Sequence, residues 1–172
     1  MSPETVQALA VQHLGFYLFK DTSGKDQVAN SKVDLDGVFL VRKTEKNYAQ
    51  WPKSAGGPYD GFLLSTANVF ARELDSVLSL LGQGRRDEAE RLADRLTRVI
   101  QGCFEIVGGF HVGNAFTNAN KVLDHLMAHG EAGVRREPPL LYSDVRLPAA
   151  FVESAAALLR QNSLMPARGY LE

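Results

Sequence analysis

Cysteine is nearly absent from this sequence, since Cys103 is the only one among 172 residues. An intrachain disulfide is therefore impossible, and the composition fits a reducing compartment. No apolar run approaches the roughly 20 residues that a membrane-spanning helix needs, and residues 1–5 are neither basic nor apolar. We therefore expect no membrane segment, no signal peptide and a cytoplasmic location.

An excess of charge of one sign is also missing, because the net charge is -1 and the sequence pI is about 6.4. No basic stripe interleaved with aromatic residues is present, so we do not expect nucleic acid as a partner. Hydrophobic residues make up 45% of the chain and charged residues 23%, as in an ordinary globular protein. A chain of this length can bury a substantial core.

A short apolar stretch that ends on a lysine is the most informative segment. Residues 15–19 precede Lys20, and the polar residues 21–24 then break the run, which is typical of a buried parallel strand and its loop. Lysine is rare at the end of such a strand unless its amine is paired or used. A desolvated lysine loses proton affinity and can attack a carbonyl to form a Schiff base. The alternative is a strand-end lysine whose amine reaches water.

Three strands are predicted in the first half of the chain, over residues 15–20, 38–42 and 61–65. The intervals between them leave room for crossovers rather than tight hairpins, so parallel pairing is favoured. Ser2-Pro3-Glu4 predicts the start of a helix that ends near residues 13–15. A short helix interrupted by Pro52 is expected over residues 48–55.

The second half reads as helical, with apolar residues at helical spacing. Helices are predicted over residues 66–82, 88–107 and 117–130, the last of these capped by Thr117, with a final helix from about residue 147. Cys103 lies on the apolar face of the longest helix and is expected in the core. His125 and His129 have a spacing that can ligate zinc, but no third ligand is arranged nearby, so a solvated helix face is favoured.

Three segments of the chain resemble one enzyme family. Phe19-Lys20-Asp21-Thr22-Ser23-Gly24 resembles the Lys-Asp-Ser/Thr-Ser/Thr-Gly signature of the dihydrodipicolinate synthase / N-acetylneuraminate lyase family. Residues 56–68 resemble the Gly-Ala-Asp-Gly…Ser-x-x-Asn stretch of the same family, and residues 84–89 lead into a long amphipathic helix as they do there. The resemblance spans nearly all of this chain, but only the C-terminal half to two-thirds of the family's.

The resemblance implies an α/β fold, namely the C-terminal part of a (β/α)8 TIM barrel. Residues 1–82 are expected to form the partial barrel, with about three parallel strands, and residues 83–172 the C-terminal helices of the same domain. A whole barrel of this type needs roughly 250 residues. Either a second chain supplies the rest, or the piece packs against a copy of itself as a homo-oligomer, or the chain is truncated.

The resemblance also implies a chemistry for particular residues. Lys20 would form an imine with pyruvate or a related 2-oxo acid, with no metal and no organic cofactor. Ser65 matches a strand-end serine that contacts the substrate, although it can equally cap the following helix. Glu45 loosely matches an acid that binds the hydroxyl tail of some substrates. Arg42 and Lys43 depart from the small residues usual in the family, and a cation there can instead bind an acidic substrate.

Two functions follow from these observations. The first is a Schiff-base-forming lyase or aldolase acting on pyruvate or related 2-oxo acids. The second is a truncated, non-catalytic homologue that serves as an oligomerisation or interaction module. The strand that carries the family's proton-shuttling tyrosine is absent, and alternation along the first strand directs Tyr17 away from the side of Lys20. The missing tyrosine, the missing N-terminal strands and the Arg42-Lys43 substitution favour the second function. Lys20 and the match to the Gly-Asp-Gly…Ser-x-x-Asn stretch favour the first.

Overall fold

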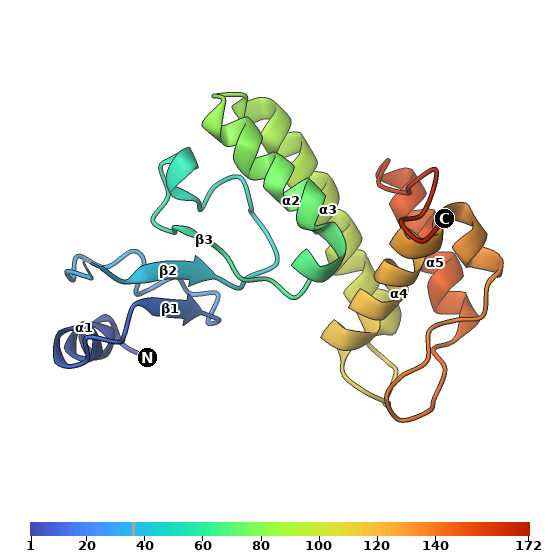
Figure 1. The fold of residues 1–172 in the computed structure, drawn as a ribbon, viewed down its shortest axis with the longest axis horizontal. Coiled ribbons are helices and arrows are strands. Elements are labelled where there is room, and N and C mark those ends of the chain that lie inside the picture. The colour runs from blue at the N-terminus through green and yellow to red at the C-terminus, as the bar shows by residue number, and fades with distance from the viewer. Residues whose placement is uncertain (36) are drawn as a thin grey trace.

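The computed structural model describes residues 1–35 and 37–172 and has a mixed α/β fold. Its elements, in chain order, are α1 (Pro3–Gln12), β1 (Leu18–Asp21), β2 (Phe39–Arg42), the 3-10 helix η1 (Lys53–Ala55), β3 (Gly61–Phe62), α2 (Ala67–Gly82), α3 (Arg86–Val107), α4 (Ala115–His129), the 3-10 helix η2 (Gly130–Arg135) and α5 (Ala149–Gln161). The sheet and α1 lie at one end of the molecule, and α4 and α5 lie at the other (Figure 1).

The three strands form one parallel sheet in the order β1-β2-β3, which confirms the predicted pairing. All three are shorter than predicted, and β3 retains only two residues. The described residues of the crossover from β1 to β2 form turns rather than a helix. The predicted helix over residues 48–55 is wrong, because Pro52 is extended and only the short η1 follows it.

The helix ends show which local predictions held. Ser2 caps α1 as predicted, since its side chain accepts a hydrogen bond from the Thr5 N–H at 3.3 Å. Thr117 is not the cap of α4. That helix begins two residues earlier, because the Asn114 side chain accepts from the Thr117 N–H at 2.9 Å. Asparagine is as good a capping residue as threonine, so composition alone does not choose between the two.

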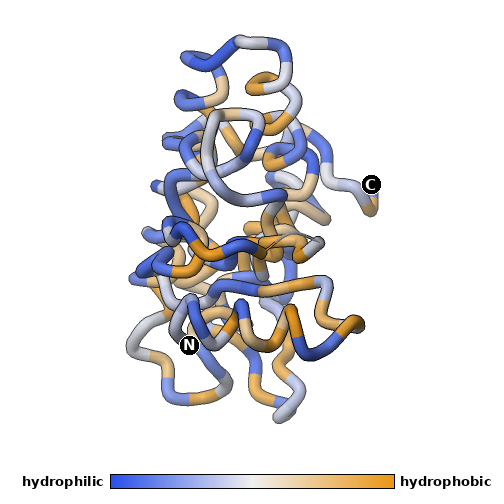
Figure 2. The backbone as a smooth tube through the Cα atoms, turned by 90° about the vertical axis from the view of Figure 1, so that its left-hand side faces the viewer, coloured by the Kyte–Doolittle hydropathy of each residue, from blue (hydrophilic) through white to orange (hydrophobic). Residues whose placement is uncertain are grey.

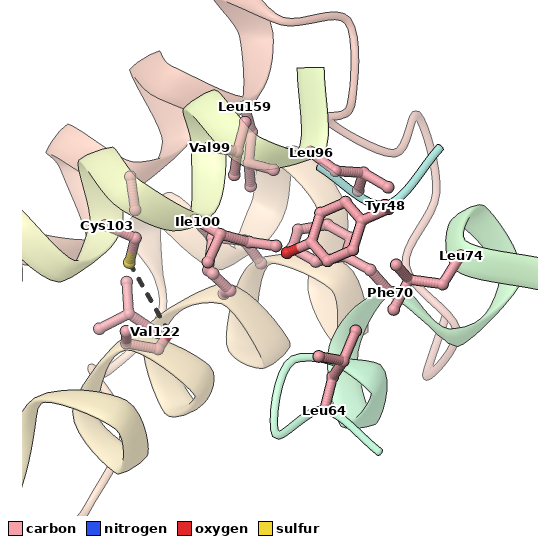
Figure 3. Packing of buried hydrophobic residues seen from close by; sticks show 14 of the residues in the cluster. Tyr48, Leu64, Phe70, Leu74, Leu96, Val99, Ile100, Cys103, Val122 and Leu159 are labelled. Atoms are coloured by element: carbon pink, nitrogen blue, oxygen red, sulfur yellow. Dashed lines mark hydrogen bonds between the residues drawn. The ribbon is translucent and has the colours of Figure 1, made fainter. Parts of the chain in front are cut away.

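One apolar core joins the four C-terminal helices to the segment that follows β2 (Figure 3). Tyr48 and Leu64, which lie between β2 and α2, pack with Phe70 of α2 and Ile100 of α3. Residues on both sides of residue 82 thus share one cluster. Cys103 lies in this core as predicted, fully buried.

The sheet contributes little to this core. Val41 is buried on β2, but the large apolar residues Leu18 and Phe39 are about half exposed. Figure 2 views the molecule from the sheet end and shows hydrophobic and hydrophilic stretches alternating along the chain there. None of the helices within residues 1–35 and 37–172 has the length and apolar composition needed to cross a bilayer.

Candidate functional site

The carboxyl ends of the three strands lie at one edge of the sheet, because the strands are parallel. In parallel α/β folds, the loops at this edge carry binding and catalytic groups. Here the edge holds Lys20 near the end of β1, Glu45 in the loop after β2, and Ser65 shortly after β3. All three residues that the sequence singled out therefore lie at the same edge.

Lys20 pairs in register with Val41 of β2 and is exposed. Its amine makes no hydrogen bond or ion pair with any residue that the structure describes. Alternation places Leu18 and Phe39 on the same face of the sheet as Lys20, and Leu63 continues that face just beyond β3. Their exposed fractions are 47%, 49% and 47%. Lys20 therefore lies on an apolar sheet face that is largely open to solvent.

The prediction that β1 is a buried strand is wrong in this chain. Parallel sheets are normally covered on both faces. On the opposite face Asp21 and Arg42 are buried, whereas among the described strand residues on the face of Lys20 only Val41 of the central strand is buried and the flanking apolar residues are half exposed. Beside Lys20 lies a hollow of about 390 Å³, whose lining includes Thr22, Ser23 and Lys25.

The carboxylate of Glu45 is buried and accepts several hydrogen bonds from its own chain. Ser65 Oγ donates to it at 3.1 Å, Thr66 Oγ1 at 2.5 Å and the Tyr48 hydroxyl at 3.2 Å, while the Thr66 N–H lies 3.4 Å away. The structure thus brings Glu45 and Ser65 together, although the sequence places them 20 residues apart. Their predicted contacts with substrate stay predictions.

A second buried polar network links β1, β2 and the loop between them. The Arg42 guanidinium donates to both carboxylate oxygens of Asp26, from Nε at 2.8 Å and from Nη2 at 3.1 Å. It also stacks 4.5 Å from the ring centroid of Trp51. Arg42 is 1% exposed, so it is not free to bind an acidic substrate as the sequence suggested.

Tyr59 closes this network, with its hydroxyl 2.7 Å from Asp26 Oδ1 and 3.1 Å from Asp21 Oδ2. Burial is the main cause that raises the pKa of Tyr59 above its usual value, and the nearby carboxylates add to it. The pKa of Tyr48 is also raised, mainly by burial and then by Glu45. Both phenols therefore stay protonated near neutral pH and are poor proton acceptors.

The loop after Lys20 is fixed by Asp21. Its Oδ1 accepts from the Ser23 N–H at 2.8 Å and from Ser23 Oγ at 2.6 Å, which makes a local turn. Gly24 follows with a φ of 65°, in the left-handed region that favours glycine. Asn68 has a similar role at the next strand end, where its side chain donates to the Ser65 carbonyl at 2.8 Å. Ser23 and Asn68 thus shape their loops.

No protein-family model and no curated protein sequence matches this chain.

The two histidines of α4 contact each other and a backbone carbonyl. His125 Nε2 contacts the Gly133 carbonyl at 2.8 Å, and the two imidazole rings meet edge to face. Burial lowers the pKa of His129. Within the described part of the chain, no group of three or more histidine, cysteine, aspartate or glutamate side chains is placed to hold a metal ion.

The sequence did not reveal the network around Arg42. One signal was available, because alternation places Arg42 on the opposite face from the exposed Lys20, and a buried arginine requires an acidic partner. That partner, Asp26, lies in the loop after β1 and has a φ of 54°, so no helical or strand periodicity marks it. Chemically, the edge offers the unpaired amine of Lys20, with two preorganised polar clusters behind it.

Proposed function

We propose that this chain carries the nucleophilic lysine of a cytoplasmic, Schiff-base-forming lyase that acts on pyruvate or a related 2-oxo acid. The observation that carries the proposal is the position of Lys20, near the carboxyl end of a parallel strand with its amine unpaired among the described residues. The resemblance of residues 19–24 and 56–68 to the lyase family supports the same chemistry.

The reaction at Lys20 is a condensation. Its neutral amine adds to the keto carbon, the carbon–oxygen bond breaks with loss of water, and a carbon–nitrogen double bond remains. The protonated imine draws electrons from the adjacent bond, so neither a metal nor an organic cofactor is required. Ser65 and Glu45 are the residues of this chain that we assign to substrate binding at the same edge.

The open apolar face supports a partner that completes the barrel. Leu18, Phe39 and Leu63 expose nearly half of their surfaces around Lys20, and β1 has an unpaired outer edge in the described sheet. Covering this face would desolvate the Lys20 amine and lower its proton affinity, which favours attack on a carbonyl. We propose that a second chain or a second copy of this one supplies the remaining wall of a (β/α)8 barrel.

The test is reduction with borohydride in the presence of pyruvate, followed by intact mass and peptide mapping. Borohydride delivers hydride to the imine carbon and leaves a stable secondary amine. We expect one reduced pyruvate adduct per chain, mapped to Lys20, which disappears in Lys20→Ala. Lys25→Ala is the matched control, because Lys25 lines the same hollow and is also exposed. Absence of an adduct, or an adduct spread over several lysines, would count against the lyase.

The same exposed face supports the alternative, an oligomerisation or interaction module without catalysis. Sedimentation analysis of the parent chain and of Phe39→Ser separates the two functions when it is combined with trapping. A self-associating chain that traps no pyruvate, and whose association is weakened by Phe39→Ser, would favour the module.

A further inference from the structure

Lys43 is a second lysine at the carboxyl edge of the sheet, and its surroundings differ from those of Lys20. Its backbone N–H donates to the Asp21 carbonyl at 2.9 Å, so the pairing of β1 and β2 continues one residue beyond β2. The side chain is half-buried, and Nζ lies 3.9 Å from the ring centroid of Phe116 on α4.

The positive charge of Lys43 is held in place but not neutralised. A cation over an aromatic face is attracted to the ring while it keeps its charge. Among the described residues, no carboxylate lies within ion-pair distance of Lys43. Its neighbour Arg42 differs, because its guanidinium is paired with Asp26. Glu45 borders the same hollow, but its carboxylate accepts from hydroxyl and N–H groups of its own chain.

The hollow beside Lys43 has a volume of about 320 Å³. Polar groups of Thr22, Ser23 and Thr44 line it on the side of the strand loops, and Gln101, Phe104 and Phe116 line it on the side of the helices. The Ser23 hydroxyl already donates to Asp21, but a positive charge beside Thr22, Thr44 and an aromatic wall suits a carboxylate on a short carbon chain.

We propose that Lys43 binds a carboxylate, namely the distal carboxylate of a dicarboxylic 2-oxo acid whose keto group reacts at Lys20. This assignment of substrate class rests on the proposed function, because the reaction of the keto group at Lys20 is part of that proposal. Lys20 pairs with Val41, two residues before Lys43, which places the two lysine Cα atoms about 8 Å apart. The hollows beside the two lysines share Thr22 and Ser23 as lining residues. Two flexible lysine stems can therefore reach the two ends of one five-carbon diacid.

The first test measures carboxylate binding without imine chemistry. Glutarate, which lacks a keto group, is titrated into the Lys20→Ala chain while the ring resonances of Phe116 are followed by NMR. We expect saturable shifts of these resonances. The affinity for glutarate should be at least tenfold weaker when Lys43→Gln is added. It should be unchanged by Lys46→Gln, the control at an exposed lysine three residues away. The monoacid butyrate should shift the same resonances only weakly. Equal shifts in Lys43→Gln, or none in Lys20→Ala, would overturn the assignment.

The second test asks whether Lys20 and Lys43 bind the two ends of the same substrate. Borohydride trapping is compared for 2-oxoglutarate and pyruvate at equal concentration. We expect Lys43→Gln to reduce trapping of 2-oxoglutarate severalfold and to leave that of pyruvate unchanged. If both fall equally, Lys43 does not select a diacid. If the parent chain traps neither acid, the proposed lyase fails, and the glutarate titration still decides whether Lys43 binds carboxylates.

Discussion

The hydroxyl of Ser65 donates a hydrogen bond of 3.1 Å to the carboxylate of Glu45, across 20 residues of sequence. The bond ties the loop after β2 to the residues between β3 and α2. Thr66, which precedes α2 directly, donates to the same carboxylate. Glu45 thus sets the position of Ser65 at the edge of the sheet.

Replacing the Glu45 carboxylate should destabilise this edge. In Glu45→Gln one acceptor oxygen becomes an NH2 group that faces hydroxyl donors, so we expect a loss of about 1–3 kcal/mol in the free energy of unfolding. Urea denaturation measures it. Glu105→Gln is the control, because Glu105 is exposed on α3, and it should change stability by less than about 0.5 kcal/mol. Equal effects of the two substitutions would contradict the role given to Glu45.

The Arg42–Asp26 pair should be far more sensitive than a surface pair. Its two side chains are 2% and 6% exposed. Arg42→Met leaves the Asp26 charge buried without compensation, so we expect a loss of about 3–5 kcal/mol. Arg86→Met breaks the exposed pair with Glu90 and should cost about 1 kcal/mol or less. Chemical denaturation of both variants, with Arg42→Met/Asp26→Asn as a partial rescue, checks the comparison.

The Tyr59 hydroxyl should contribute to stability through its hydrogen bonds to Asp26 and Asp21. Tyr59→Phe keeps the buried ring and removes only the donor, so we expect a loss of about 1–2 kcal/mol. Tyr170→Phe is the matched control, since that hydroxyl donates to Asp124 at 2.8 Å but the residue is 65% exposed. A control loss as large as that of Tyr59→Phe would show that burial of the network is not what matters.

The parallel sheet was predictable from the sequence because three apolar runs begin at residues 15, 38 and 61, too far apart for hairpins. The helices were predictable because apolar residues recur with helical spacing, as at Leu96, Val99, Ile100 and Cys103 on α3. These signals are local and periodic. The shortness of β3 was not predictable, because it depends on where Leu63 and Leu64 leave the ladder rather than on their apolarity.

The candidate site was predictable only in part. Lys20 stands out by its position at a strand end, whereas Glu45 and Ser65 stand out only through the resemblance to the lyase family. Their environments were not evident, because burial of Glu45 depends on Tyr48 and Thr66, and pairing of Arg42 depends on a loop residue. Exposure of the Lys20 face was missed for a different reason. An apolar strand predicts that a covering layer exists, but not that this chain provides it.

The pH dependence of stability should carry a contribution from Asp26. The hydrogen bond from Arg42 is the main cause that lowers the pKa of Asp26 in the folded state below its ordinary value. A lowered folded-state pKa means that the contribution is fully present above the unfolded-state pKa, near 4, and is lost as the pH falls through the folded value. Wild-type stability should therefore fall below about pH 4, and more steeply than that of Asp26→Asn. Identical slopes in urea denaturation from pH 5 to pH 2 would exclude this contribution.

The Cys103 thiol should be unreactive in the folded protein. Burial raises its pKa to about 12, and the residue is fully buried, with its thiol against the Ala119 carbonyl of α4. Thiolate is the reactive form, so at pH 8 a chromogenic disulfide reagent should react at the rate of global unfolding and quickly only in denaturant. A surface cysteine introduced as Ser79→Cys, at an exposed position of α2, gives the rate for an accessible thiol under the same conditions. Comparable rates for Cys103 and Ser79→Cys in native buffer would mean that the core between α3 and α4 opens far more readily than its packing indicates.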